Sequence, residues 1–462
     1  MGGTALSGVV GIYSSNRKDV AQVVYYGLYA LQHRGQISAG IAVNNNGFID
    51  YHREAGLVNE VLSKDNLYKL TGNIAIGHVR YAFNSSNQSL LTTLPLVAGY
   101  KRGALAITLD GSIVNSNILR DKLEEEGVIF QSELDAEVIA NLVARNSRDN
   151  IEEAVIKSLD ELSGSYALIM MTNDRLIAAR DPYGIKPLCL GKLGKDYIVS
   201  SESCVFDNIG AEFLRDIDPG EVIVIDNEAL RTISRKKAKE NLCLFELVYF
   251  ARPDSLLYGK SIYSSRREAG RQLARESRND ADIIIGGPDS GTVFAIGFAE
   301  EANIPYAEGL IKNRYVGRTF IQPSQELREQ GVMIKLNAIK ENIDGKRIIL
   351  VDDSIVRGTT MKRIVQMLKK AGAKEVHVRI ASPPVINACH LGMDTPSKKD
   401  LIAANMSSEE IRKLIGADSL YFMSLEGLVK SVGKNNGFCT GCFNNRYAID
   451  PPEEEGKNVY NL

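Results

Sequence analysis

The sequence predicts two domains of different fold class in one chain. The first half carries many short apolar runs separated by Asn and Gly turns, which favours stacked antiparallel sheets with helices outside them. From Ala281 onward, apolar runs alternate with helical periodicity, which is typical of a parallel α/β sheet. A length of 462 residues is enough for two or three domains. We place the boundary at the basic run 235–239 and expect domains at residues 1–235 and 236–430, followed by a C-terminal segment at 431–462.

Composition and charge argue against several classes of protein. Hydrophobic residues make up 44% and charged residues 24%, as in an ordinary globular protein. The 55 Lys and Arg against 57 Asp and Glu give a net charge of −2, which disfavours binding to nucleic acid or to a membrane surface. No apolar run approaches the ~18 residues of a membrane helix, and residues 1–6 do not resemble a signal peptide. We therefore expect a cytoplasmic protein.

The first half can be followed in chain order. Residues 8–13 predict a short buried strand, and a helix with one apolar face follows from Val20 to Leu31. Further short strands continue up to residues 220–225. The Pro and Gly of residues 180–188 predict a rigid turn between two of these strands.

A strand–loop–helix pattern in the second half predicts a site for a sugar phosphate. The apolar run 347–351 ends in Asp352 and Asp353, as a buried parallel strand does when it leaves the core. After a loop of small residues, an apolar stripe at helical spacing starts at Met361. The N–H groups of residues 357–360 would point at a phosphate, and the two carboxylates could hold ribose hydroxyls directly or through Mg²⁺. The alternative is an ordinary strand-to-helix turn.

Two further segments suit the same kind of ligand. The predicted strand 282–287 ends in the loop 288–292, where open α/β sheets bind ligands. Residues 312–335 are rich in cations, amides and glycine, which suits a mobile lid that folds over a pyrophosphate and excludes water. Otherwise, a charged loop of this kind is a solvated surface.

Four of the six cysteines form a candidate metal site. Cys189 and Cys204 lie in apolar surroundings and are expected to be small buried hydrophobes. In a cytosolic chain the other four indicate metal binding before disulfides, and their spacing accepts either Zn²⁺ or a 4Fe–4S cluster. The alternative is a free C-x2-C on a flexible tail. The four candidates are Cys243, Cys389, Cys439 and Cys442.

The motif DDSIVRGTT at residues 352–360 matches the signature of phosphoribosyltransferases for 5-phosphoribosyl 1-pyrophosphate (PRPP). Its residue sequence resembles most closely that of the amidophosphoribosyltransferase family, the glutamine-dependent enzymes that catalyse the first step of purine synthesis. The likeness runs through about residues 7 to 446. It implies an N-terminal-nucleophile glutaminase domain, a four-layer αββα sandwich, followed by a type I phosphoribosyltransferase domain with a parallel sheet. It also implies a homotetramer that is inhibited by AMP and GMP.

The resemblance implies which residues bind PRPP and the cofactors. Asp352 and Asp353 would hold ribose hydroxyls and, with Ser290, Mg²⁺. The four cysteines Cys243, Cys389, Cys439 and Cys442 coincide with the ligands of the iron–sulfur branch, whose 4Fe–4S cluster is structural; Zn²⁺ is the alternative occupant. The implied PRPP-binding set is Asp289, Ser290, Gly291, Lys312, Arg314, Lys335, Asp352, Asp353, Ser354, Arg357, Gly358, Thr359 and Thr360.

The resemblance also implies a glutaminase site whose reactive residues are replaced. The family's nucleophile is a cysteine whose own α-amino group is the base once a short leader is removed, whereas this chain has Ser7. Serine is a weaker nucleophile unless a base activates it, and that base is missing if residues 1–6 stay attached. The family's oxyanion hole is an Asn-Gly pair, but this chain has Asp110 and Gly111. An ionised Asp110 accepts hydrogen bonds and would repel a developing oxyanion.

Other departures and two retained residues complete this site. Ile37 replaces an expected acid, and residues 82–84 replace small hydroxyl residues. Arg80 would pair with the glutamine carboxylate, or else form an ion pair that stabilises the fold. Asp135 would hold the amino group of glutamine. We therefore predict that the glutaminase domain keeps its fold and has lost its chemistry.

Three functional hypotheses follow. The first is an amidophosphoribosyltransferase that makes phosphoribosylamine from free ammonia, or from ammonia supplied by a glutaminase-active partner. The second is a regulatory subunit that binds PRPP or purine nucleotide without turnover. The third is a fully glutamine-dependent enzyme in which Ser7 works despite Asp110.

Overall fold

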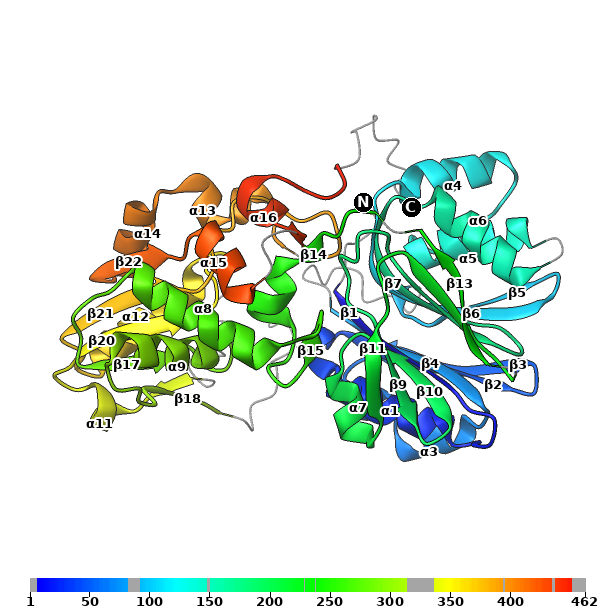
Figure 1. The fold of residues 1–462 in the computed structure, drawn as a ribbon, viewed down its shortest axis with the longest axis horizontal. Helices are drawn as coiled ribbons and strands as arrows, with labels where there is room; N and C mark the ends of the chain where they lie inside the picture. Colours follow the sequence, from blue (N-terminus) through cyan, green and yellow to red (C-terminus); the bar gives the residue numbers. More distant parts are fainter. Residues whose placement is uncertain are drawn as a thin grey trace. The chain divides into compact units, whose positions relative to one another are not determined.

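The computed structural model describes residues 6–81, 92–147, 150–227, 229–236, 238–313, 336–393, 395–433 and 437–450 (Figure 1). These residues divide into two compact units. The first unit lies within residues 1–242, 389–394 and 447–462. The second unit lies within residues 243–388 and 395–446. A short segment from the later part of the chain, residues 389–393, therefore packs with the first unit.

Two antiparallel sheets form the centre of the first unit. In its described residues, one sheet has seven strands in the order β11-β9-β10-β1-β4-β2-β3, and the other has six in the order β13-β12-β8-β7-β6-β5. The strands of the first sheet are β1 Ser7–Tyr13, β2 Ser38–Asn45, β3 Phe48–Ala55, β4 Ile74–Arg80, β9 Cys189–Leu193, β10 Asp196–Ser200 and β11 Glu212–Asp216. Those of the second sheet are β5 Leu96–Tyr100, β6 Gly103–Ile113, β7 Gly164–Met171, β8 Leu176–Arg180, β12 Glu221–Ile225 and β13 Leu230–Arg235.

Three apolar clusters hold the layers of the first unit together. Between the sheets, Val9 and Ile76 of the first sheet pack in one cluster with Ile169 of the second. The outer face of the first sheet is covered by α1 Val20–Ala30, α2 Val58–Val61, α3 Lys64–Lys69 and α7 Cys204–Ile209. The outer face of the second sheet is covered by α4 Ser116–Glu125, α5 Asp135–Asn146 and α6 Ile151–Glu161. The order helix–sheet–sheet–helix confirms the predicted αββα sandwich (Figure 1).

The second unit is built on a parallel sheet, as the sequence predicts. In its described residues, four strands pair in the order β17-β20-β21-β22, and all three pairings are parallel. The strands are β17 Ile283–Gly286, β20 Arg347–Asp352, β21 Glu375–Ile380 and β22 Ser419–Phe422. One face of the sheet packs against α12 Thr359–Lys370 and α14 Ser408–Ile415. Helix α9 Gly291–Ala302 contacts β17 and β20. Helix α8 Ile262–Glu276 packs against α9, and α15 Leu425–Val432 packs against α8.

Smaller elements surround this sheet. Short strand pairs are formed by β14 Leu242–Cys243 with β23 Phe438–Cys439, β15 Leu256–Leu257 with β16 Lys260–Ser261, and β18 Leu310–Lys312 with β19 Leu336–Ala338. Short helices are α11 Lys340–Ile343, α13 Ile402–Asn405 and α16 Gly441–Asn444, and residues Glu246–Phe250 form a π-helical turn.

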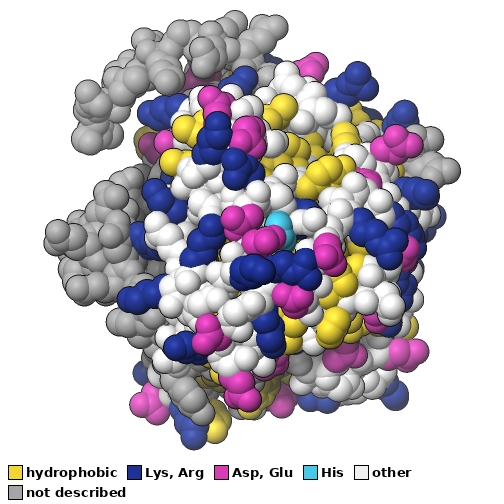
Figure 2. Space-filling view, turned by 90° about the vertical axis from the view of Figure 1, so that its left-hand side faces the viewer, with side chains coloured by type: hydrophobic (Ala, Val, Ile, Leu, Met, Phe, Trp, Pro, Cys, Tyr) yellow, Lys and Arg dark blue, Asp and Glu magenta, His cyan; other side chains and the backbone are white. Residues whose placement is uncertain are grey.

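The surface has the mixed charge that the composition predicts. Among the described residues in Figure 2, Lys and Arg side chains are interspersed with Asp and Glu on the face turned to the viewer. Within the parts of the chain that the structure describes, no helix is both long and apolar enough to cross a bilayer.

Helices α8 and α9 approach each other closely at two glycines. A Cβ on Gly297 would fall on the carbonyl oxygen of Arg267, and one on Gly270 would fall on that of Phe294. Both contacts would lie far inside van der Waals distance, so the pair packs backbone against backbone. This packing holds α9, whose first turn follows one of the loops of the candidate site.

We expect Gly297→Ala to lower the free energy of unfolding by about 1–3 kcal/mol, because the added methyl group would push α8 and α9 apart. Chemical denaturation of the full chain measures this loss. Gly99→Ala is the matched control, since no heavy atom lies within 4 Å of its added Cβ. Equal unfolding free energies for the two variants would contradict this account of the helix pair.

Candidate functional site

Two strand ends of the second unit bring the predicted phosphate loops together. Strands β17 and β20 are parallel and paired in register from Ile283 with Ile348 to Gly286 with Val351, so they end at the same edge of the sheet. Helices α9 and α12 start after the loops that follow these strands. Helix N-termini carry N–H groups without intrahelical partners, which favours a phosphate at this edge.

Asp353 connects the two loops. The hydroxyl of Ser290 donates to its Oδ1 at 2.6 Å, and the hydroxyl of Ser354 donates to its Oδ2 at 2.6 Å. The N–H of Asp353 donates to Oδ1 of Asp352 at 3.0 Å. The structure therefore brings together the three residues that were predicted to hold Mg²⁺.

The two adjacent carboxylates make a place for a cation. Burial raises the pKa of Asp352 well above its ordinary value, and the charge of Asp353 raises it further. The backbone at Gly287 lies against the same carboxylate, since a Cβ there would be 2.7 Å from Oδ1 of Asp352. A divalent cation with oxygen ligands would offset this repulsion, so the residues present fit Mg²⁺.

The other predicted PRPP residues flank this pair. Lys312, at the end of β18, donates to Oδ2 of Asp289, and the guanidinium of Arg357 lies 3.9 Å from Oδ2 of Asp400. Gly358 caps α12, whose first residues are Thr359 and Thr360. Gly291 is the first residue of α9. Arg314, Lys335 and most of the predicted lid lie outside the described residues.

The four candidate thiols are divided between the two units. Cys243 and Cys439 lie on the paired strands β14 and β23, and the carbonyl of Cys442 accepts N–H groups from Ile386 and Asn387 at 2.9 and 3.1 Å. Cys389 belongs to the segment that packs with the first unit, and its sulfur accepts the N–H of Leu391 at 3.3 Å.

The chemistry of the four cysteines can be compared with the ligands that an iron–sulfur cluster requires. Four cysteine thiols are the ligand type of an iron–sulfur cluster, and N–H bonds to sulfur are typical of its ligands. Among the described residues, no group of three or more His, Cys, Asp and Glu side chains is placed to hold a metal ion. A four-iron cluster spaces its thiolates farther apart than a single ion does. By ligand type the residues therefore fit the cluster.

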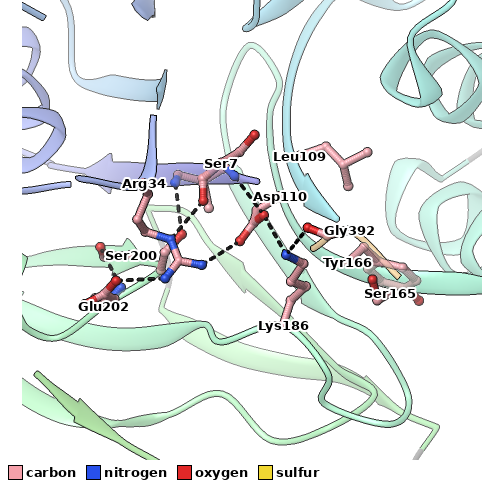
Figure 3. Close-up of polar contacts among 12 residues, drawn as sticks. Ser7, Arg34, Leu109, Asp110, Ser165, Tyr166, Lys186, Ser200, Glu202 and Gly392 are labelled. Atoms are coloured by element: carbon pink, nitrogen blue, oxygen red, sulfur yellow. Dashed lines mark hydrogen bonds and ion pairs between the residues drawn. The ribbon is translucent and has the colours of Figure 1, made fainter. Parts of the chain in front are cut away.

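The predicted glutaminase residues meet where the two sheets of the first unit approach each other (Figure 3). Ser7 starts β1, the middle strand of its sheet, and Asp110 lies in β6 of the other sheet; both are buried. The N–H of Ser7 donates to Oδ1 of Asp110 at 3.1 Å. While Leu6 stays attached, this nitrogen is a peptide donor and not a base. The carbonyl of Leu6 in turn accepts the N–H of Tyr81 at 2.9 Å.

Asp110 is held by two cations that sequence reasoning did not assign to the site. Arg34 contacts its Oδ2 at 3.1 Å, and the ammonium of Lys186 lies 3.1 Å from its Oδ1. Arg34 also donates to the carbonyl of Ser7 at 2.9 Å and pairs with Glu202 at 2.7 Å. Two cations and two anions thus form a buried network (Figure 3). The charge of Asp110, which the sequence presents alone, is neutralised here.

A signal for these residues existed in the sequence. Arg34 lies in the run His-Arg-Gly-Gln, and Lys186 lies in the turn that was assigned a structural role. Charged residues in apolar or turn-forming surroundings are candidates for buried pairs. Their partners are too distant in the chain for spacing to reveal.

Arg80 and Asp135 make backbone contacts in the described residues. Arg80 donates to the carbonyl of Thr92 at 2.5 Å. Asp135 accepts the N–H of Ile113 at 2.9 Å, and burial raises its pKa. Asp135 thereby fixes the turn after β6. Their predicted roles toward glutamine stay predictions, and residues 82–84 lie outside the described residues.

Residues 391–392 cover Gly111. The hydroxyl of Ser165 donates to the carbonyl of Leu391, and Lys186 donates to the carbonyl of Gly392, both at 2.8 Å. A Cβ on Gly392 would lie 2.8 Å from Cα of Gly111 and 2.9 Å from Cε of Lys186. This segment therefore lies directly on the glycine of the predicted oxyanion hole.

Comparison with protein families agrees with the two units. Residues 85–208 match the glutamine amidotransferase domain family, and residues 256–382 match the phosphoribosyl transferase domain family.

Full-length relatives and solved structures extend this likeness. The chain is 47% identical to the amidophosphoribosyltransferase of Archaeoglobus fulgidus over 97% of this chain and 99% of the relative. It is 45% identical to that of Bacillus subtilis over 96% and 94%. It superposes on an allosteric regulatory enzyme of purine biosynthesis with a TM-score of 0.92, at 44% identity over 97% of both chains. The glutamine PRPP amidotransferase of B. subtilis, complexed with ADP and GMP, gives 0.90 at 45% identity over 97% and 98%.

We expect Asp352→Asn to stabilise the unliganded protein increasingly as pH rises from 5 to 8. The folded-state pKa of Asp352 is raised, so its contribution to stability is present below its ordinary pKa of 3.8 and is lost as pH rises through the folded-state pKa. The gain at high pH should be about 1.4 kcal/mol for each unit by which the pKa is raised. Denaturant titrations at several pH values measure it.

Asp282→Asn is the control of opposite sign. Arg347 lowers the pKa of Asp282 to about 2, so this carboxylate stabilises the fold at neutral pH and its removal should destabilise the protein. If both variants shifted stability in the same direction at pH 8, the account of the acid pair would be wrong.

Proposed function

The chain belongs to the amidophosphoribosyltransferase family, and on that premise we propose that it forms 5-phosphoribosylamine from PRPP and ammonia. Membership follows from relatives that are 47% and 45% identical over nearly the whole of both chains. The family consists of glycosyltransferase-type enzymes of purine biosynthesis. We infer the source of nitrogen, the residues that bind the substrates and the cofactors from the geometry of the two sites and from the family likeness.

The proposed reaction is a displacement at C1 of the ribose. The C1–O bond to pyrophosphate breaks with its electron pair leaving on pyrophosphate, and the nitrogen of ammonia bonds to C1 and then loses a proton. An oxocarbenium-like state needs positioning and stabilisation of the leaving charge more than covalent help. The ordered acid pair and the two helix N-termini at one sheet edge support this chemistry.

Each chain segment at this edge has a proposed task. Asp352 and Asp353 hold the ribose hydroxyls and, with Ser290, bind Mg²⁺. Bound Mg²⁺ would supply positive charge that stabilises the leaving pyrophosphate. Residues 354–360, including Ser354, Arg357, Gly358, Thr359 and Thr360, hold the 5′-phosphate. Asp289 to Gly291, with Lys312, Arg314 and Lys335, hold the pyrophosphate.

The nitrogen source is inferred from the closed network around Ser7 and Asp110. With Leu6 attached, the nitrogen of Ser7 is a peptide N–H that donates to Asp110, and a peptide nitrogen is not a base for the serine hydroxyl. Both oxygens of Asp110 are engaged by Ser7, Arg34 and Lys186, and a carboxylate offers no donor to an oxyanion. We therefore propose that glutamine is not hydrolysed here. Free ammonia or a glutaminase-active partner supplies the nitrogen.

We also propose a structural 4Fe–4S cluster on Cys243, Cys389, Cys439 and Cys442, with Zn²⁺ as the alternative occupant. The ligand type of these four cysteines and the N–H bond to the sulfur of Cys389 support it. The homotetramer and the inhibition by purine nucleotides are proposed on family grounds. The relative that is complexed with ADP and GMP supports nucleotide regulation.

We expect PRPP-dependent pyrophosphate release with ammonium chloride, and a rate with glutamine at least about 10²-fold lower, because losing one oxyanion donor alone costs that much. The protein should be purified anaerobically and both nitrogen sources assayed in parallel. Asp353→Asn, which removes one of the two negative charges proposed to bind Mg²⁺, should abolish both activities. Equal turnover with glutamine would refute the inactive amide site. No turnover with either, together with tight nucleotide binding, would favour the regulatory subunit.

We expect Cys442→Ser to lose its iron and to unfold at a lower temperature, because structural cluster binding contributes to folding. Iron, sulfide and zinc content per chain and a thermal melt measure this. Cys204→Ser is the matched control, since Cys204 is a buried thiol of the first unit and should leave the iron content unchanged. Iron retained in full by Cys442→Ser, or zinc in place of iron in the parent protein, would contradict the cluster.

A further inference from the structure

The network around Asp110 is closed and balanced in charge. The side chains of Arg34, Asp110 and Glu202 are fully buried, and that of Lys186 is 2% exposed. Arg34 lies between the two acids, whereas Lys186 pairs with Asp110. The partly exposed His33 contacts Glu202 from the outer side at 2.7 Å. The four buried groups therefore sum to zero charge.

Asp110 is the acid that pairs with Lys186, whereas Arg34 pairs with a second acid as well. Arg34 also has Glu202 and the carbonyl of Ser7. The ammonium of Lys186 is held between Oδ1 of Asp110 and the carbonyl of Gly392. If Asp110 lost its charge, Lys186 would be a buried cation facing a carbonyl. Breaking such a pair from one side is far more costly than removing both partners.

The ammonium of Lys186 lies beside the predicted oxyanion hole, 3.1 Å from Oδ1 of Asp110 (Figure 3). The chain at Gly392 lies against both Gly111 and the end of the Lys186 side chain, at distances that leave no room for a Cβ on Gly392. The carbonyl of Leu391 accepts a hydrogen bond from the hydroxyl of Ser165. Residues 391–392 therefore pack on the glycine of the predicted oxyanion hole.

We propose that Lys186 is a specificity-determining residue that closes the amide site from within. Its ammonium, paired with Asp110 and capped by residues 391–392, occupies the place where the amide of glutamine would react. This plug, defined as Lys186, Asp110, Leu391 and Gly392, rests on the proposal that the amide site is inactive. Asp110 and Lys186 form one buried ion pair. Restoring Asn at 110 alone leaves the site both closed and unbalanced in charge.

A double-mutant cycle tests the pairing. Asp110→Asn and Lys186→Gln should each lower the melting temperature of the full chain by on the order of 10 °C, because each leaves one buried charge uncompensated. Asn can still accept from Ser7, and Gln can still donate to Gly392. The double variant should therefore melt within about 3 °C of the parent protein. Additive losses in the double variant would overturn the pairing.

An exposed pair of the same chemistry provides the control. Lys236 and Asp160 also lie 2.8 Å apart, but their side chains are 67% and 47% exposed. Lys236→Gln, Asp160→Asn and their combination should each shift the melting temperature by less than about 2 °C. A coupling as large here as in the buried pair would show that burial is not its cause.

A labelling experiment tests the closure itself. Three proteins that carry Ser7→Cys are compared. The first keeps Asp110 and Lys186, the second also carries Asp110→Asn, and the third carries both Asp110→Asn and Lys186→Gln. Each protein is treated at about pH 8.5, where a free thiol is partly ionised, with a chloroketone analogue of glutamine. The mass gained at position 7 is then measured, with the Ser7 parent as blank. We expect modification in the triple variant at least 10-fold faster than in Ser7→Cys alone.

The outcomes separate this inference from the proposed function. If Ser7→Cys alone were labelled as fast as the triple variant, the plug would be wrong. If the cycle showed coupling but the triple variant stayed unlabelled, the pair would be structural and the plug would again be overturned. Glutamine hydrolysis by the parent protein would refute the inactive amide site of the proposed function. The coupling in the melting temperatures would still be measured independently.

Discussion

The contact between Asp110 and the start of β1 is the constraint on which this end of the first unit depends. The carboxylate accepts the N–H of Ser7 in the middle strand of one sheet and lies itself in a strand of the other. It also neutralises Arg34 and Lys186. Without it, two buried cations would share the single charge of Glu202. One carboxylate therefore links the sheets and balances the charge that their junction encloses.

The buried acids of the first unit are paired with cations, whereas those of the second unit lie next to each other. In the first unit each acid of the network has a cation. In the second unit Asp352 and Asp353 repel each other, and their hydrogen bonds come from hydroxyl and backbone groups. Such a pair costs stability until a cation or hydroxyl-bearing ligand arrives. Charge balance thus distinguishes the network around Asp110 from the acid pair of the second unit.

The sequence predicted most of the fold because its signals were local. Strand and helix periodicities predicted both fold classes, and the acids at the end of β20 marked a loop that the structure brings beside the loop after β17. The network could not be predicted, because 76 residues separate Arg34 from Asp110 and 168 separate it from Glu202. Spacing carries no information over such distances. The return of residues 389–393 to the first unit was missed for the same reason.

A buried acid requires a compensating charge whether or not its site is reactive. Arg34 and Lys186 supply that charge for Asp110, so the charge inside the αββα sandwich is balanced. The acid pair of the second unit has no such compensation in the described residues and keeps its cost. Features that reduce stability persist where binding or catalysis uses them. The uncompensated pair therefore marks a place where a bound cation would lower the electrostatic cost, whereas the balanced network around Asp110 needs none.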